Sequence, residues 1–485
     1  MTSELLIALS LLLPAGGAAL IAISARAPNL RDTVTLASAT ALFITVASLV
    51  PVVLGGGRPE LRLVELFPGI ALEFRVEPLG LLFALIASGL WILSGLYSIG
   101  YMRRNREAHQ TRFYVCFALA LASTISIAFA GNLLTLFVFY EMLTLVTYPL
   151  VTHNGDDAAR RAGRTYLGVL LLTSTVLFLP AIVVCWLVSG TLDFMPGGIL
   201  EGRISRSGAT VLLVMFVFGI GKAAIMPFHR WLPAAMVAPA PVSALLHAVA
   251  VVKAGVFAIL KVIVYTFGLD ASGALFGWLP YVAGFTIIAA SIVALRADNL
   301  KRRLAYSTVS QLSYVVLAAA ILAPISIVGA ALHVAAHAFG KITLFFAAGA
   351  IYTAAHKTQV SELDGLGRRM PWTLGAFAVA SLSMIGLPPT AGLISKWYIV
   401  MGAMQAQQWF ALAVIAASTL LNAGYFVPIV YRAFLRKPID EALAQGEAPL
   451  PMVLSLVATA ALTVLMFFYA DLPLALARGL VGLSP

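Results

Sequence analysis

Residues 211–265 read VLLVMFVFGIGKAAIMPFHRWLPAAMVAPAPVSALLHAVAVVKAGVFAILKVIVY. The stretch is long and apolar enough to cross a hydrocarbon layer of about 30 Å twice, at about 1.5 Å per helical residue. Pro227 and Pro233 interrupt its first half. Proline removes a helical hydrogen bond, and the carbonyls that it frees are tolerated in a membrane only beside protein or a watery cavity. The stretch therefore predicts one broken membrane span followed by a continuous one.

The whole chain shares this apolar character. Of its 485 residues, 61% are hydrophobic and 11% are charged, against roughly a quarter charged in an average soluble domain. Breaks at Gly, Pro and charge clusters divide the chain into about fourteen apolar spans. The first, from Leu5 to Ala25, is predicted to be a retained span and not a secretory signal, because Glu4 stands where a signal carries basic residues.

Basic residues are distributed unevenly between the predicted loops. Most of the 31 Lys and Arg residues fall in loops that follow odd-numbered spans. The positive-inside rule places these loops in the cytoplasm, and both termini on the outer, periplasmic side of a bacterial inner membrane. Topology thus accounts for the net charge of +11, and we expect a lipid bilayer and no nucleic acid as the partner of this charge.

A second span is broken like the seventh span, which contains Pro227 and Pro233. The twelfth span, five after the broken seventh, is interrupted by Gly386, Pro388, Pro389 and Gly392. Two broken helices at corresponding places of two halves mark a transport site, and an odd repeat length implies that the halves are inverted.

These patterns predict an all-α polytopic membrane protein. We expect about fourteen transmembrane helices, with two inverted repeats of about five helices each and one broken helix in each repeat. Alternation of apolar and charged residues from Leu61 to Glu65 predicts a short outer-face hairpin within residues 55–77. The predicted units are N-terminal helices at 1–110, a first repeat at 111–268, a second repeat at 272–435 and a C-terminal helix at 448–485.

Charged side chains inside the predicted spans are the candidate functional groups. A charge at the bilayer centre costs at least about 2.5 to 3.5 kcal/mol on insertion scales. Lysine changes its pKa readily when it is desolvated and arginine does not, so a buried lysine can carry a proton. The ionisable groups within spans are Glu141, Lys222, Lys253, Lys261, Lys341 and Lys396.

Glu141 lies in LLTLFVFYEMLTLVTYPL, with apolar neighbours on both sides. Its partner must therefore come from another helix. Lys222, just before the first break, is the candidate, because Gly219 and Gly221 would let another helix approach closely. The pair is either a structural lock between two helices or part of a proton path.

Two further segments carry buried bases. Lys253 follows His247 without an acid nearby, and Lys261, nearer the span end, is expected to snorkel toward the interface. In HVAAHAFGKITLFF, His333, His337 and Lys341 are four residues apart, which places them on one helix face about 6 Å apart per step. That spacing suits a relay bridged by water. Zinc binding by the two histidines would need a third ligand, which no spacing supplies.

Lys396 lies just after the second break, in GLPPTAGLISKWYIV. It would connect the buried groups to one surface, or it would be an interfacial anchor beside Trp397. His229 and Arg230 are expected near the cytoplasmic interface, with no catalytic role.

No cofactor is expected. Cys116 and Cys185 are isolated within apolar runs, and no soft ligands occur at the spacings of iron–sulfur, haem or zinc sites. The glycines at 55–57 form no nucleotide-binding motif. Redox chemistry by this chain itself is therefore disfavoured.

From about Tyr114 to Ala433 the chain resembles the antiporter-like subunit family shared by Mrp-type cation/proton antiporters, membrane-bound hydrogenases and the membrane arm of respiratory complex I. The strings that carry the resemblance are KAAIMPFHRWLPAAMVAPAPVSALLHAVAVVKAG, KRRLAYSTVSQLSY and GLPPTAGLISKW. It implies about fourteen core helices, inverted repeats and outer-facing termini. It also implies proton-carrying roles for Glu141, Lys222, His247, Lys253, His333, His337, Lys341 and Lys396.

Within that family, AAMVAPAPVSALLHAVAVVKAG resembles the D-type Mrp subunit and its hydrogenase relatives. Complex I counterparts more often carry acids where Ala234 and Val237 stand. Two positions depart from the family pattern. Tyr140 stands where a Trp commonly precedes the glutamate, and Gln311 stands where relatives often have His, which leaves the eleventh span to carry a histidine relay.

Three functions are hypotheses at this point. The first is a proton-translocating subunit of a multisubunit Mrp-type antiporter that exchanges Na⁺ for protons. The second is a proton-pumping subunit of a redox-driven complex, related to complex I or a membrane-bound hydrogenase. The third is a scaffold subunit, against which the complete lysine series argues. In each case the partners would be other membrane subunits.

Overall fold

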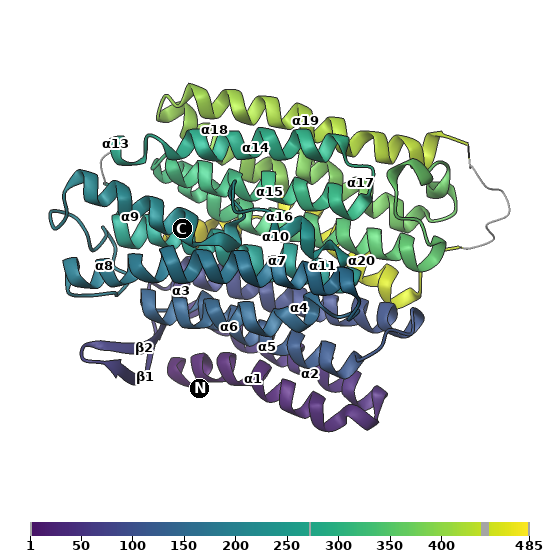
Figure 1. Cartoon of the computed structure of the whole chain (residues 1–485), viewed down its shortest axis with the longest axis horizontal. Helices are drawn as coiled ribbons and strands as arrows, with labels where there is room; N and C mark the ends of the chain where they lie inside the picture. Colours follow the sequence, from purple (N-terminus) through teal and green to yellow (C-terminus); the bar gives the residue numbers. More distant parts are fainter. Residues whose placement is uncertain (1, 271–272, 438–445, 484–485) are drawn as a thin grey trace.

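The computed structural model describes residues 2–270, 273–437 and 446–483. Its helices run side by side along the longest axis, and a β-hairpin projects at one end (Figure 1). The side of a membrane that the termini face stays a prediction. Residues 1, 272 and 485, which bound predicted units, lie outside the described residues.

The first part of the chain begins with peripheral helices, then the hairpin, then the first bundle. The helices, in chain order, are α1 (Ser3–Ile23), α2 (Pro28–Ala47), α3 (Val50–Leu54), α4 (Pro78–Arg104), α5 (Gln110–Ala128), α6 (Leu133–Val151), α7 (Asp157–Thr173), α8 (Leu179–Ser189), α9 (Arg206–Gly219), α10 (Trp231–Ala234), α11 (Ala240–Ala244) and α12 (Val251–Val262). Short π-helical turns join α7 to α8 and α11 to α12.

The second part continues the bundle. Its helices are α13 (Gly273–Phe276), α14 (Leu279–Arg296), α15 (Leu300–Ala320), α16 (Pro324–Ala355), α17 (Pro371–Ile385), α18 (Ala391–Gln405), α19 (Trp409–Leu435), α20 (Leu450–Phe468) and α21 (Asp471–Gly479).

Eleven helical segments of the described chain are long and apolar enough to cross a membrane. The eleven do not include the two predicted broken spans, which consist of shorter helices, or α15, which begins with basic residues. The all-helical membrane fold is thus confirmed. The count of fourteen spans, the inverted repeats and the unit boundaries stay predictions.

Two segments form the centre of the bundle. The most apolar 18-residue stretch of Ala240–Phe267, a segment that includes α11 and α12, is 100% buried. The corresponding stretch of α16 is 94% buried. By contrast, the corresponding stretches of Ser3–Arg26 and Pro28–Leu54 are only 39% and 33% buried. A helix that is apolar on every face is stable only inside protein or membrane, so the predicted His and Lys residues of these two segments lie in the core.

The predicted hairpin is confirmed. Strands β1 (Glu60–Phe67) and β2 (Ile70–Arg75) pair antiparallel, with Phe67 opposite Ile70. The backbone N–H of Arg75 donates to the Phe129 carbonyl at 2.6 Å, so the hairpin is attached to the turn between α5 and α6.

Both predicted helix breaks are present. The first extends from the end of α9 at Gly219 to Trp231, and Lys222 lies within it, in a 3₁₀ turn. The expectation that Lys222 precedes the break is therefore wrong, because the helix ends earlier than its prolines require. The second break separates α17 from α18.

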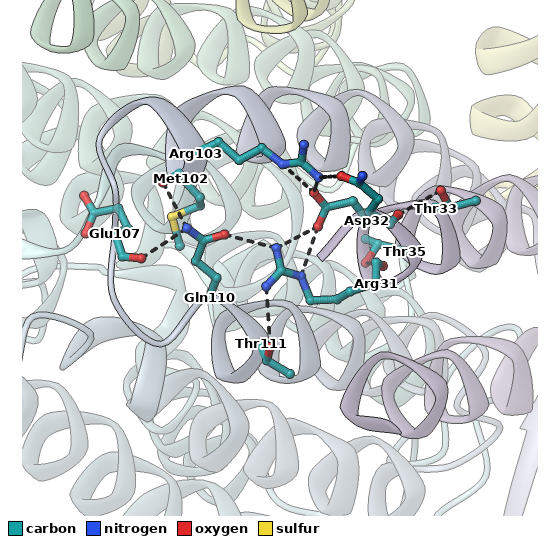
Figure 2. A network of polar contacts seen from close by, with 10 residues as sticks. Arg31, Asp32, Thr33, Thr35, Met102, Arg103, Glu107, Gln110 and Thr111 are labelled. Carbon is teal, nitrogen blue, oxygen red and sulfur yellow. Dashed lines mark hydrogen bonds and ion pairs between the residues drawn. The ribbon is translucent and has the colours of Figure 1, made fainter. Parts of the chain in front are cut away.

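An ion-pair cluster attaches the peripheral helix α2 to α4 and α5 (Figure 2). Asp32 is 4% exposed, and its Oδ1 accepts from Arg31 Nη2 at 2.9 Å. Its Oδ2 accepts from Arg103 Nε at 2.9 Å. Arg31 also donates to Gln110 at 3.0 Å. One carboxylate thus joins two cations that come from different helices.

Candidate functional site

Lys222 is wholly buried at the first break. Its Nζ donates to the Tyr140 carbonyl and to Thr144 Oγ1, both at 2.6 Å. The ammonium also lies 3.2 Å from the centre of the Tyr140 ring, and the Lys222 backbone N–H donates to the Tyr140 hydroxyl at 3.0 Å. Neutral acceptors of α6, and not a carboxylate, hold this lysine.

Glu141 does not contact Lys222. Among the described residues no ion pair within 4.0 Å joins the two side chains. Glu141 is partly buried, and its Oε1 has no hydrogen-bond partner. Lys222 instead contacts the residues that flank this glutamate on α6. The predicted partners thus lie beside each other without forming the direct pair that the sequence suggested.

The glycines of the first break allow close packing, as predicted, but against a different helix. An added Cβ at Gly219 would lie 2.5 Å from Phe178 N, and one at Gly221 would lie 2.4 Å from Thr173 Oγ1. Both neighbours belong to the α7–α8 segment. On α12, a Cβ at Gly255 would lie 2.3 Å from the Lys222 carbonyl carbon, so the helix of Lys253 packs directly on the break.

Lys253 contacts the predicted histidine stripe. Its Nζ lies 2.8 Å from His337 Nδ1 and donates to the Val334 carbonyl at 2.9 Å. Lys253 and His337 are both 0% exposed. His247, one π-helical turn before α12, is also buried, and neither of its ring nitrogens has a hydrogen-bond partner. The sequence thus identified two elements whose side chains meet in the core.

The stripe on α16 reaches the second broken helix. The ring centres of His333 and His337 are 6.1 Å apart, which matches the spacing expected for one helix face. His333 Nδ1 lies 3.0 Å from Ser395 Oγ on α18. Lys341 turns toward α15 instead, where its Nζ donates to the Leu304 carbonyl at 3.2 Å and to Ser307 Oγ.

Lys396 lies at the second break and is 5% exposed. Its Nζ donates to the carbonyls of Met384 and Ile385 at 3.0 and 2.8 Å. These are carbonyls at the end of α17 that the break frees. Trp397 next to it is 59% exposed, whereas the Lys396 side chain points inward, so the interpretation of Lys396 as an exposed interfacial anchor is wrong.

Gly386 makes room for this lysine. Its φ is +93°, and an added Cβ would lie 2.7 Å from Lys396 Cδ. The Met384 carbonyl also accepts from Gln311 Nε2 and Asn422 Nδ2, both at 3.3 Å. Gln311 therefore donates to the same carbonyl as Lys396.

The snorkelling expected for Lys261 is wrong. The side chain is 0% exposed, and its Nζ lies 3.2 Å from Glu77 Oε2 at the start of α4. The helical segment continues past Lys261 to Phe267, and the lysine contacts Glu77 and the Ala130 carbonyl inside the protein.

Known proteins resemble the chain in both sequence and fold. Residues 130–422, more than half of the chain, match the family described as NADH:quinone oxidoreductase/Mrp antiporter, transmembrane region. The chain belongs to this family. It is 35% identical over 395 residues to NADH-quinone oxidoreductase subunit N of Desulforudis audaxviator, covering 79% of this chain and 77% of that protein.

A further relative and a solved structure are also similar to the chain. The chain is 26% identical over 392 residues to the D-type subunit of a Na⁺/H⁺ antiporter from Alkalihalophilus pseudofirmus, covering 80% of this chain and 78% of that protein. A chain in the structure of the Mrp complex from Dietzia sp. superposes with a TM-score of 0.89 at 22% identity, covering 99% of this chain and 97% of that chain. This last likeness shows that the fold is shared.

In this NADH:quinone oxidoreductase/Mrp antiporter family member, contacts extend from the core to the second break through Lys253, His337, His333 and Ser395. Amines and imidazoles can both accept and release protons. No group of three His, Cys, Asp or Glu side chains converges in the described part of the chain in a way that could hold a metal ion.

The acceptors of these lysines escaped the sequence analysis. They are neutral groups, namely the Tyr140 carbonyl, Thr144, Ser307 and the carbonyls at the second break. Ser and Thr are common in membrane helices, where they bond to neighbouring helices, so their presence gives little signal. The nearest clue was Thr144, one turn after Tyr140.

Proposed function

We propose that this chain is a proton-translocating subunit of a multisubunit membrane antiporter that exchanges a monovalent cation, Na⁺, for protons. The contact between Lys253 Nζ and His337 Nδ1 at 2.8 Å carries the proposal. Both groups are fully buried, and no acid is paired with them among the described ion pairs. A purely structural lysine would need a counter-ion, whereas two basic groups in contact can share and pass one proton.

In the proposed path, Glu141 and Lys222 switch between a closed pair and an open arrangement. The present contacts, with Lys222 on Tyr140 and Thr144, correspond to the open arrangement. Closing requires the ammonium to leave the Tyr140 carbonyl and to reach the unpartnered Glu141 Oε1. Opening would push the proton of Lys222 toward Lys253, because α12 packs on the break at Gly255.

From Lys253 the proton would pass to His337 and His333 and would leave by Lys396. Lys341 and His247 flank this path and would adjust it through their charge. Each transfer changes the charge at one group, and in a low-dielectric interior this alters the proton affinity of the next. The carbonyls at the second break would hold Lys396 while it is charged.

A redox-driven proton pump is the second candidate. The observation that favours it is the higher identity to NADH-quinone oxidoreductase subunit N, 35%, than to the D-type Na⁺/H⁺ antiporter protein, 26%. In either case the chain would work with other membrane subunits in a bacterial inner membrane. Its termini would face outward, as the distribution of Lys and Arg indicates.

Cation/proton exchange in inverted vesicles that hold this chain with its neighbouring subunits tests the proposal. A pH dye would report a response to sodium or potassium, and Lys222→Ala or Lys396→Ala should abolish it while the complex still assembles. Lys437→Ala, which alters an exposed lysine, is the matched control. A response to an electron donor alone would favour the redox pump, and normal transport by both variants would refute the path.

A further inference from the structure

A second buried ion pair lies near the hairpin, outside the path described above. Lys261 Nζ is 3.2 Å from Glu77 Oε2 and donates to the Ala130 carbonyl at 2.5 Å. The ammonium also lies 4.3 Å from the centre of the Phe194 ring. The side chains of Lys261 and Glu77 are 0% and 5% exposed. A lysine and a carboxylate are thus removed from water together, and the free-energy cost of this desolvation is offset only by close pairing and hydrogen bonds.

A large cavity opens beside this pair. Its volume is about 830 Å³. Glu77 is one of its lining residues, and so is Tyr265, in the π-helical turn that follows α12. The other lining groups that carry charge include Arg58, Glu60, Arg75 and Asp193. A cavity of this size with charged walls is wide enough to hold many waters. Glu77 therefore lines the cavity and also contacts Lys261.

Arg75, Glu60 and Arg58, which also line this cavity, have partners of their own. Arg75 pairs with Glu60 at 2.5 Å and with Glu73 at 3.0 Å. Burial raises the pKa of Glu73, although Arg75 acts in the opposite direction. Arg58 donates to the Gly57 carbonyl at 2.8 Å. Among the described ion pairs, Lys261 is therefore the only cation on Glu77.

We propose that Glu77 and Lys261 form a proton-exchange site between the cavity at the hairpin end and the buried interior of the chain. A proton leaves the Lys261 ammonium for the Glu77 carboxylate, which makes a neutral amine and a neutral acid. The acid then gives its proton to water in the cavity. The same two steps run in reverse for uptake. The inference rests on the proposed proton-translocating function and adds an opening to it.

The site is coupled to the central lysine through α12. Lys261 follows Lys253 by eight residues on one helix, which is roughly 12 Å along its axis. A unit charge at that distance in a protein interior changes the proton affinity of the other lysine by about tenfold. Loss of the proton at Lys261 therefore favours protonation of Lys253 without any direct contact.

The alternative is that the pair only attaches α12 to the start of α4. Arginine separates the two roles, because it keeps the charge and the ion pair but does not release its proton in proteins. Lys261→Arg should therefore preserve assembly and lower the initial rate of proton movement in the vesicle assay at least tenfold. Glu77→Gln should lower it similarly, and Glu60→Gln, at an exposed cavity acid, should change it less than twofold.

Wild-type rates in both Lys261→Arg and Glu77→Gln, with an unchanged pH profile, would overturn the proposal and leave the pair structural. If Lys261→Arg does not assemble, the double variant Lys261→Met with Glu77→Gln decides, because a buried pair replaced by neutral groups is often tolerated. An assembled double variant with normal transport overturns the site, and one with lost transport supports it.

Failure of this inference differs from failure of the proposed function. Wild-type vesicles distinguish cation exchange from redox pumping, because protons move on addition of sodium or potassium in the first case and of an electron donor in the second. The exchange site is tested by the ratio of variant to wild-type rates under whichever addition works. A cation-insensitive wild type that responds to an electron donor would thus refute the antiporter role and leave the site testable.

Discussion

The Lys222 ammonium lies 2.6 Å from the Tyr140 carbonyl oxygen, and the hydroxyl of the same tyrosine accepts the Lys222 backbone N–H at 3.0 Å. One residue of α6 thus holds both the side chain and the backbone of the lysine at the first break. The neighbouring Glu141 is left without this contact. The position of Tyr140 therefore determines which arrangement of the proposed switch is favoured.

Tyr140→Phe removes the hydroxyl and keeps the ring and the carbonyl. A hydrogen bond of this kind contributes about 1 kcal/mol, so we expect the lysine to leave its present position more easily and the transport rate to change by about fivefold. Tyr140→Trp, which restores the residue of the family pattern, should behave like Phe, because an indole N–H cannot accept from Lys222. Vesicle transport rates measure both variants, and unchanged rates in both would show that the hydroxyl has no role in the switch.

His337→Gln tests the contact with Lys253. Glutamine can still bond to the Lys253 ammonium but cannot carry a proton, so the proton-movement rate should fall by about tenfold or more, in the range typical of a lost acid–base group. His229→Gln, at a histidine to which no role is assigned, is the control and should retain normal rates. Equal rates in the two variants would exclude His337 from the path.

The sequence was informative where a residue type is rare or restrictive. Proline and glycine revealed both breaks, since few residues are compatible with an interrupted membrane helix. Lys and His residues within an apolar run are also noticeable, because ionisable side chains are rare inside membrane spans. The spacing of His333 and His337 predicted a separation of about 6 Å, and the ring centres lie 6.1 Å apart, because α-helix geometry is fixed.

The partners of these residues could not be read in the same way. Lys261 pairs with Glu77, which lies far earlier in the chain, in front of α4. Only the packing of the end of α12 beside the start of α4 brings the two together. Lys222 and Lys396 are held by main-chain carbonyls, and every residue has one, so no side-chain pattern marks them. Long-range packing, which composition does not encode, decided these contacts.

Asp32→Ala should destabilise the attachment of α2 to α4 and α5. Arg31 is almost fully buried and would lose its main counter-ion, and Figure 2 shows Arg103 reaching the same carboxylate. Removing one member of a buried ion pair typically costs about 3 to 5 kcal/mol. The apparent Tm in detergent should fall clearly. Asp157→Ala, which breaks an exposed pair with Arg160, should leave it almost unchanged, and equal shifts would contradict this role.

His153 should make the protein less stable in acid. It lies in the turn after α6, its side chain is 2% exposed, and neither ring nitrogen has a hydrogen-bond partner. Burial, with Arg112 and His109 adding to it, lowers the pKa of His153 from its usual 6.5 to about 4. The Glu107 carboxylate, 4.0 Å from Nε2, does not offset this.

The unfolded chain therefore binds a proton at His153 between about pH 6.5 and 4 that the folded chain does not. The stability contributed by the neutral ring is complete above about pH 6.5 and is lost as the pH falls toward 4. His153→Gln cannot be protonated, so its apparent Tm should fall less between pH 7.5 and 5 than that of the wild type. His356→Gln, at an exposed histidine, should follow the wild type. Parallel declines in all three proteins would show that another group causes the acid sensitivity.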